Sequence, residues 1–310
     1  MKLVLLDAKT LGELKELELL RKYGELVVYQ YTTSDEVVER VSDADIIITN
    51  KVIINRQVMD HAANLKLICV AATGMNNIEL DYAALKGIQV KNVKGYSTEG
   101  VAQHTFALIL YILNHISLYD QFVKNKSYSG STIFTHHAWP IHELGSMKFG
   151  IIGLGAIGEK VGEIAKAFGA EVRYYSTSGN NTNEKFKRVS LEELLKNSDI
   201  ISIHAPLNET TTNLISYKEL IQMKPTSILV NTGRGGIINE GDLAKIIDEE
   251  RILAAALDVF EKEPLPDRSP LLFIRNHDRL IVTPHIAWAG VESRKRLIEG
   301  ICRNIEEFLN

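Results

Sequence analysis

KFGIIGLGAIG, residues 148–158, carries the strongest structural signal in this chain. Its first five residues predict a short buried strand, and residues 159–168 predict a helix directly after the glycines. Gly153 permits a tight turn, Gly155 lets the backbone approach a pyrophosphate, and Gly158 lets helix and strand pack closely. The start of such a helix offers free N–H groups and a partial positive charge to phosphates. A bare GxGxxG also fits a plain βα turn, but with strand and helix in place it predicts a dinucleotide site.

The strand–helix alternation extends in both directions from this motif. After it, strands are expected at 170–175, 200–204, 228–231, 253–257 and 279–282, capping boxes start helices at Ser190 and Ser216, and further helices cover 240–248 and 291–309. Roughly 140 residues precede the motif, which is enough for another domain. There, strands at 3–6, 26–29, 45–49, 67–71 and 88–92 alternate with helix-like segments at 11–22, 34–41, 56–63 and 80–85. This alternation predicts an α/β protein with two parallel sheets.

Composition narrows the class of protein. The chain has 310 residues, 45% hydrophobic and 24% charged, with a net charge of −4, which argues against nucleic-acid or membrane-surface partners. Cys69 and Cys302 form no CxxC pair and no zinc set, so we expect a reducing, cytoplasmic setting and no metal. The apolar N-terminus is too short for a signal segment, and Asp7 ends it.

Two segments between the lobes stand apart. Residues 101–116 predict one helix that bridges the lobes, with His104 packed between them. Residues 124–145 lack a period, and such excursions usually carry function or an oligomer contact. Its histidines at 136, 137 and 142 lack the acidic partners of a metal site, so a loop that packs across a dimer, with Trp139 near the neighbouring active site, is the better hypothesis.

Three polar residues lie where predicted strands of the second lobe end: Arg234, Glu263 and His285. In open parallel sheets, ligands bind beyond the carboxyl ends of the strands. Arginine matches a carboxylate with two hydrogen bonds, and a carboxylate beside a histidine favours the imidazolium, which can donate a proton. Each residue alone is more often structural; together, behind a dinucleotide turn, they predict hydride reduction of a 2-keto acid.

The same motifs resemble a known family. GLGAIG at 153–158, NTGR at 231–234, ALDVF at 256–260, Glu263-Pro264 and TPHIAW at 283–288 look like the signatures of the D-isomer-specific 2-hydroxyacid dehydrogenases. AATGMNN at 71–77 and NVKGYS at 92–97 are similar to the subset called hydroxypyruvate reductases or glycerate dehydrogenases. The resemblance covers essentially the whole chain.

The resemblance implies two doubly wound domains with a cleft between them. A flavodoxin-like substrate domain would comprise residues 1–97 and 287–310, and a Rossmann NAD(P)-binding domain residues 98–286. It implies Arg234 as substrate binder and carbonyl polariser, His285 as acid and base, Glu263 as its partner, and a homodimer. Backbone groups of Thr73, Gly74, Met75 and Asn76 would bind the substrate carboxylate, and Asp258 would lie near the nicotinamide carboxamide. We expect cofactor contacts from Gly153, Gly155, Ala156, Ile157, Gly158, Ser176, Thr177, Pro206, Thr232, Gly233, Arg234, Asp258, His285 and Ala287.

One departure concerns the cofactor. NAD-specific members usually place Asp at the end of the strand after the glycine helix, whereas here Tyr175 is followed by Ser176 and Thr177, with neither an acid nor an arginine. NADP(H) is therefore admitted without being selected, and we favour NAD(H). Two rival functions stay open. One is a nucleotide-sensing regulatory module, and the other is formate oxidation, which would need Gln in place of Glu263.

Overall fold

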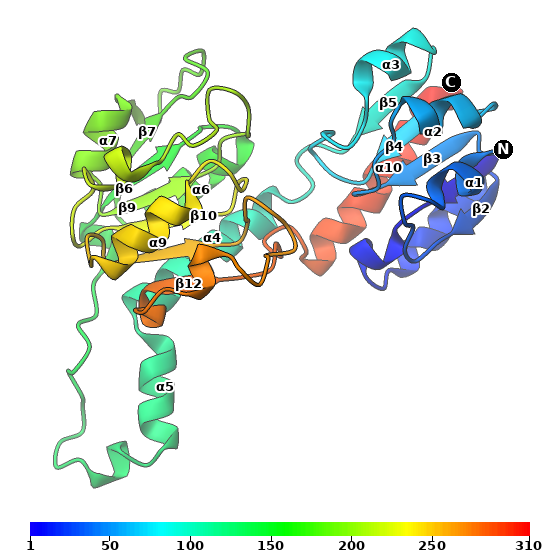
Figure 1. The fold of residues 1–310 in the computed structure, drawn as a ribbon. Helices are drawn as coiled ribbons and strands as arrows, with labels where there is room; N and C mark the ends of the chain where they lie inside the picture. The colour runs from blue at the N-terminus through cyan, green and yellow to red at the C-terminus, as the bar shows by residue number, and fades with distance from the viewer. The chain divides into compact units, whose positions relative to one another are not determined.

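The computed structural model describes residues 1–310, which form two compact units (Figure 1). The first unit consists of residues 1–97 and 288–310, and the second of residues 98–287. Each unit contains one parallel β-sheet with a buried apolar cluster on either face. The chain is therefore α/β with two doubly wound sheets.

The sheet of the first unit has the strand order β2-β1-β3-β4-β5, the flavodoxin-like order. Its strands are β1 (Lys2–Leu5), β2 (Glu25–Val28), β3 (Ile46–Thr49), β4 (Leu67–Val70) and β5 (Gln89–Asn92). One face is covered by α1 (Val37–Val41), α2 (Arg56–His61) and α3 (Leu80–Leu85), and the other by the 3₁₀ turns η1 (Ala8–Leu11) and η2 (Lys15–Tyr23) and by α10 (Val291–Leu309). Successive strand residues point to opposite faces, so Leu3 joins one core and Val4 the other.

Residues 11–22, predicted as a helix-like segment, form the 3₁₀ turns η1 and η2 rather than an α-helix. Gly12 interrupts the segment with a φ of +68°. The guanidinium of Arg294, on α10, donates a hydrogen bond to the Leu11 carbonyl at 2.8 Å. A side chain at position 12 would meet this guanidinium. The left-handed φ of Gly12 is incompatible with a continuous α-helix through this position.

The sheet of the second unit has the order β12-β11-β10-β9-β6-β7-β8, all parallel. Its strands are β6 (Lys148–Ile152), β7 (Glu171–Tyr175), β8 (Lys187–Arg188), β9 (Ile200–Ile203), β10 (Ile228–Asn231), β11 (Ala254–Leu257) and β12 (Leu280–Val282). The order reverses between β6 and β9, as in Rossmann sheets. Helices α4 (Thr98–Leu113) and α6 (Ala156–Ala167) cover one face, and α7 (Leu191–Asn197), α8 (Tyr217–Leu220) and α9 (Glu240–Asp248) the other.

The single helix predicted over 101–116 is instead two helices. Their break lies at His115, whose φ is +48°, and α5 (Ile116–Lys124) follows it. No single helix is long and apolar enough to cross a membrane; α4 and α5 reach that length and hydropathy only as a pair bent by 57°.

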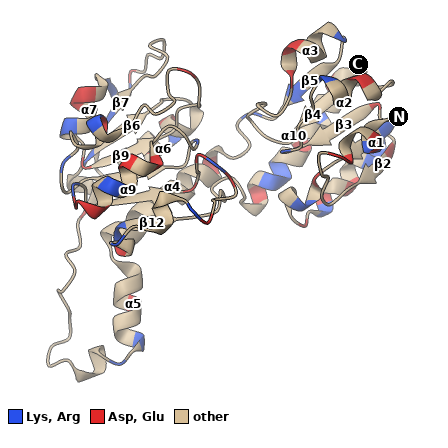
Figure 2. Cartoon of the chain, in the orientation of Figure 1, with Lys and Arg blue, Asp and Glu red and all other residues tan.

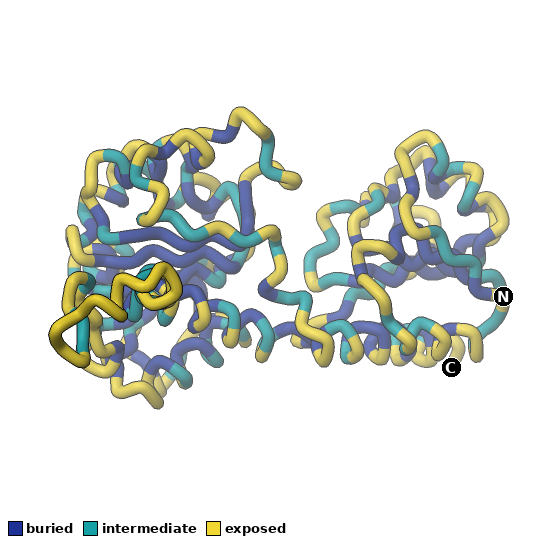
Figure 3. Tube along the Cα trace, turned by 90° about the horizontal axis from the view of Figure 1, so that it is seen from below, coloured by how far each residue is buried: buried dark blue, intermediate teal, exposed yellow.

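We call residues 116–143 the arm. It extends away from the sheet of its own unit (Figure 1), is exposed along most of its length (Figure 3) and carries few charges (Figure 2). Helix α5 has no buried residue. Tyr119, Phe122, His136 and Trp139 pack their rings on one another within the arm. The arm therefore has a small aromatic core of its own, with apolar side chains left on its outside.

Candidate active site

In the glycine turn after β6, each of the three glycines has a different steric environment. Gly153 has a φ of +90°, and a Cβ there would lie 2.7 Å from the backbone of Ala205. A Cβ on Gly158 would lie 2.3 Å from the Gly153 carbonyl oxygen. A Cβ on Gly155 would meet nothing within 4 Å. Two of the glycines are thus demanded by packing, and the middle one keeps a space open above the backbone.

That space lies at the N-terminus of α6. Gly155 is the N-cap residue, and no side chain caps the helix. The first-turn N–H groups, including those of Ala156 and Ile157, therefore have no side-chain acceptor, and the helix dipole adds partial positive charge there. An open cradle with free donors suits a pyrophosphate, so this end of the unit fits the dinucleotide that the motif predicts.

The loop after β7 is uncharged and tied to the glycine turn. The side-chain amide of Asn181 donates to the Leu154 carbonyl at 2.9 Å. Thr177 is half-buried, whereas Ser176 is buried and its hydroxyl has no partner. Arg188, on the short strand β8, donates to the carbonyl of Gly179 at 2.9 Å. The sequence did not point to this arginine, because it stands twelve positions after Ser176.

His285 and Glu263 form a direct pair at the carboxyl edge of the same sheet. The Nδ1 atom of His285 lies 2.6 Å from Glu263 Oε2, while the other carboxylate oxygen accepts the Phe260 N–H at 3.0 Å. Nε2 of His285 has no hydrogen-bond partner within the chain. The side chains are 24% and 31% exposed, respectively. The imidazole is thus oriented from one side and leaves its second nitrogen available to a ligand.

Asp258 holds the turn that carries His285. Its carboxylate is fully buried and accepts the Thr283 hydroxyl at 2.6 Å and the backbone N–H groups of Ile286 and Ala287 at 2.9 and 2.8 Å. Its carbonyl accepts the His285 N–H at 2.8 Å, and this contact accompanies the left-handed φ of +55° at His285. A contact between Asp258 and a carboxamide stays a prediction; within the chain, Asp258 fixes the backbone of the turn that carries His285.

His104 joins this network from α4. Its Nε2 lies 3.0 Å from the Thr283 hydroxyl and 3.6 Å from Asp258 Oδ1. His104 makes these polar contacts within its own unit, and its expected packing between the lobes stays a prediction. No spacing in the sequence links it to residues 179 positions away.

Arg234 extends from the loop after β10, the strand next to β11. Asn231 holds this loop by donating to the Arg234 carbonyl at 2.8 Å and accepting the Gly233 N–H at 3.0 Å. Any Cβ on Gly235 would collide with the Phe260 carbonyl, so the loops of Arg234 and Glu263 are in backbone contact. The guanidinium of Arg234 is in no ion pair; it donates only to the Gly233 carbonyl, at 2.7 Å. It therefore retains donors for an anionic ligand.

Thr232 and Pro206 complete the predicted cofactor edge. The Thr232 hydroxyl lies 3.0 Å from that of Thr105 and is buried, whereas Pro206 is exposed after β9. His204, directly after β9, lies 2.8 Å through Nε2 from the Ser202 hydroxyl, and its Nδ1 is buried without a partner. Burial lowers the pKa of the His204 imidazole from 6.5 to about 3. His204 is thus a neutral, structural histidine at neutral pH.

The predicted substrate loop, residues 73–76, lies in the first unit after β4. None of its four backbone N–H groups donates a hydrogen bond within the chain. Asn92 Nδ2 donates to the Thr73 carbonyl at 2.5 Å, and the Asn77 side chain donates to the Val52 carbonyl at 2.9 Å. A run of unsatisfied donors on a fixed loop suits a carboxylate.

Asp7 fixes the backbone of residues 50–52, which contact the predicted substrate loop through Asn77. Its position just after β1 did not predict this role. Its carboxylate is 2% exposed and accepts the backbone N–H groups of Asn50, Lys51 and Val52 at 2.9, 2.7 and 3.3 Å. Asn77 donates its hydrogen bond to Val52 in this same segment. Sequence alone cannot show this, because the bonded groups are more than 40 positions apart.

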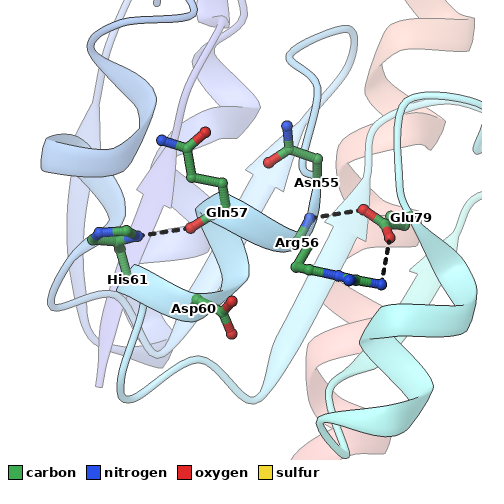
Figure 4. Close-up of a pocket in the computed structure, with 6 residues that line it drawn as sticks. All are labelled: Asn55, Arg56, Gln57, Asp60, His61 and Glu79. Atoms are coloured by element: carbon green, nitrogen blue, oxygen red, sulfur yellow. Dashed lines mark hydrogen bonds and ion pairs between the residues drawn. The ribbon is translucent and has the colours of Figure 1, made fainter.

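The surface pocket of the first unit is a different feature (Figure 4). It is lined by Asn55, Arg56, Gln57, Asp60, His61 and Glu79. Arg56 pairs with Glu79 through its backbone N–H at 2.8 Å and its guanidinium at 3.7 Å, and Asp60 pairs with Lys86 at 2.9 Å. Its charges are already satisfied, so it is not the candidate site.

Comparisons with known proteins point to one family. The family model of the NAD-binding domain of D-isomer specific 2-hydroxyacid dehydrogenases matches residues 106–287. Hydroxypyruvate reductase from Blautia hydrogenotrophica is 39% identical over 318 residues, covering 100% of this chain and 97% of that protein. Glyoxylate reductase from Aeropyrum pernix is 38% identical over 302 residues, covering 94% and 89%. The structure of D-lactate dehydrogenase from Aquifex aeolicus, complexed with NAD and lactic acid, aligns with a TM-score of 0.84 at 27% identity, covering 100% and 95%.

Proposed function

The chain belongs to the D-isomer-specific 2-hydroxyacid dehydrogenase family, and from this premise we propose that it reduces hydroxypyruvate, glyoxylate or a similarly small 2-keto acid to the D-2-hydroxy acid. The reverse oxidation uses the same groups. It is an oxidoreductase with NAD as cofactor. The observation that carries the proposal is the His285–Glu263 pair, 2.6 Å apart, with Nε2 of His285 left without a partner.

Three residues of the second unit each have one role in this reaction. Nicotinamide, when bound, supplies the hydride that the keto carbon accepts. His285 gives the proton at Nε2 to the keto oxygen, and Glu263 stabilises the imidazolium from which that proton comes. Arg234 binds the substrate and polarises its carbonyl group. In the reverse direction, His285 removes the hydroxyl proton.

The dinucleotide would lie along the carboxyl edge of the second unit. Its pyrophosphate is proposed to meet the α6 N-terminus, where Gly155 leaves space. The other proposed contacts are Gly153, Ala156, Ile157, Gly158, Ser176, Thr177, Pro206, Thr232, Gly233, Arg234, Asp258, His285 and Ala287. In the first unit, the free N–H groups of residues 73–76 are proposed to bind the substrate carboxylate.

Steady-state kinetics test the proposal. NADH and NADPH are each assayed against hydroxypyruvate, glyoxylate, pyruvate and larger 2-oxo acids. His285→Ala should lower kcat by roughly 10²–10⁴, and Arg234→Gln should raise KM for the keto acid. No turnover with any keto acid, or wild-type turnover of His285→Ala, would overturn the assignment.

The regulatory alternative makes a different prediction in the same assay. A nucleotide sensor would bind NADH and leave it unconsumed with every keto acid. The paired His285 and Glu263, together with an unpaired Arg234, favour the enzyme, because a sensor has no need of an oriented proton donor. Formate oxidation is disfavoured because position 263 is Glu rather than Gln.

We further propose a cytoplasmic homodimer in which the arm takes part. Phe134 is 90% exposed, and Ile133 and Ile141 of the same arm are 58% and 56% exposed. Large apolar side chains at such exposure are typical of an interface. Phe134→Glu should shift sedimentation from dimer to monomer, while a dimeric variant would remove the arm from the interface. Trp139→Ala should alter KM values if the arm reaches a neighbouring active site; unchanged values across several keto acids would contradict that.

A further inference from the structure

The loop after β7 has no charged residue of its own, but an arginine from the next strand brings a positive charge to it. Residues 176–183, STSGNNTN, include no charged side chain. Arg188 reaches this loop from the next strand and donates through Nη1 to the Gly179 carbonyl at 2.9 Å. Its Nε and Nη2 make no hydrogen bond within the chain. A guanidinium is thus fixed at the loop with most of its donors unused.

Arg188 differs from the cations around it. Lys185 pairs with Glu159 and Glu163, Lys187 with Glu193, and Arg173 with Glu171 and Glu193. Arg188 is in no ion pair. A surface arginine that no carboxylate neutralises, held by a backbone carbonyl, presents a full positive charge to an incoming anion.

The loop that Arg188 meets is the one beside the glycine turn. Asn181 donates to the Leu154 carbonyl at 2.9 Å, and its own carbonyl accepts the Tyr174 hydroxyl at 3.1 Å. In doubly wound folds the ribose next to the pyrophosphate lies at the end of the second strand, here β7. A group attached to the 2′ position of that ribose therefore faces the loop at residues 176–179.

We propose that Arg188 forms a subsite for the 2′-phosphate of NADP(H), with Thr177 and Ser178 offering hydroxyl donors. The chemistry is direct: a dianionic phosphate matches the planar fork of a guanidinium, and no carboxylate in the loop repels it. The inference rests on the proposed nucleotide site, and it adds a cofactor preference that the site itself does not specify. It predicts that NADPH binds more tightly than NADH.

Calorimetric binding without any keto acid tests the subsite. At low salt, wild-type protein should bind NADPH roughly tenfold more tightly than NADH, since a charge-assisted hydrogen bond at an exposed site contributes a modest part of its full value. Arg188→Gln should remove this ratio by weakening NADPH alone. Arg188→Lys keeps the charge but loses the fork, and should retain part of it. Lys187→Gln is the matched control, because it removes one charge from the same strand and should leave the ratio intact.

A second probe isolates the phosphate. Adenosine 2′,5′-bisphosphate and adenosine 5′-monophosphate differ only in the 2′-phosphate, so their affinities should differ in wild-type protein and agree in Arg188→Gln. Higher salt should shrink the difference. Equal affinities in wild-type protein, or a preference that survives Arg188→Gln, would overturn the inference.

The outcomes separate this inference from the proposed function. Keto-acid reduction by NADH with no nucleotide preference leaves the enzyme assignment standing and removes the subsite. A preference for NADPH that depends on Arg188, with no keto acid reduced, supports the subsite and removes the enzyme assignment.

Discussion

Glu263→Gln is the substitution that most directly tests the proposed catalytic role of the His285–Glu263 pair. It keeps the size of the side chain and one carbonyl oxygen to accept the Phe260 N–H, which now bonds at 3.0 Å. It removes the negative charge 2.6 Å from His285 Nδ1. We therefore expect the backbone of the loop to persist and the imidazolium to lose its stabilising partner.

The magnitude follows from the contact. A hydrogen bond to a charged group contributes about 1.5–3 kcal/mol. Because His285 and Glu263 are 24% and 31% exposed, solvent screening favours the lower part of that range, about 1.5–2 kcal/mol. At about 1.4 kcal/mol for each factor of ten, kcat should fall roughly 10- to 30-fold, while the dissociation constant of NADH stays unchanged.

The assay is NADH oxidation with hydroxypyruvate or glyoxylate, with NADH binding measured separately. Glu261→Gln is the matched control, because it removes the same charge from the same turn without touching His285 and should leave kcat near the wild-type value. Equal kcat values for Glu263→Gln and wild type would refute the role of the pair. A loss of NADH binding would show instead that Glu263 acts on the cofactor site.

Three further predictions concern the supports of the site. Gly153→Ala should lower the free energy of unfolding by about 1–3 kcal/mol in urea unfolding, because φ at this position is +90° and the new Cβ would meet backbone atoms. Gly155→Ala should leave that free energy unchanged and weaken NADH binding measured by calorimetry. Asp7→Ala should lower the free energy of unfolding by about 1–3 kcal/mol, since it removes the buried carboxylate that accepts the N–H groups of Asn50, Lys51 and Val52. It should also raise KM for the keto acid more than it lowers kcat. Since burial lowers the pKa of His204 to about 3, the unfolded chain binds a proton there first, so stability should fall as pH drops from about 6.5 toward 3; His204→Asn should flatten this pH dependence in urea unfolding, and an identical profile would contradict the reasoning.

Much of the fold was predictable because its strands are buried on both faces. Parallel strands of this kind form short apolar runs between helices, and β10 (Ile228–Asn231), α9 (Glu240–Asp248) and α10 (Val291–Leu309) end where their patterns end. The glycine turn was predictable because sterics at Gly153 and Gly158 admit no other residue. The positions of Arg234, Glu263 and His285 followed from where their strands stop.

The missed features depend on contacts between distant positions. His115 breaks α4 from α5 through a left-handed backbone conformation, with no glycine or proline to signal it. β8 has only two residues, too few to show a period, so Arg188 had no element to place it. Asp7 looked like the end of a strand, and its acceptor role depends on a loop 43 positions away.

The discontinuous first unit has a consequence for biosynthesis. Its core on one sheet face contains Leu297, Ile298, Ile301 and Ile305, which follow the second unit in the chain and are therefore synthesised after it. At about 5–20 residues per second, the 190 residues of the second unit separate the two parts by roughly 10–40 s. During that interval one face of the nascent amino-terminal sheet is covered only by η1 and η2, so its apolar residues that pack on α10 stay exposed. We expect a chain that stops before α10 to keep this apolar surface exposed.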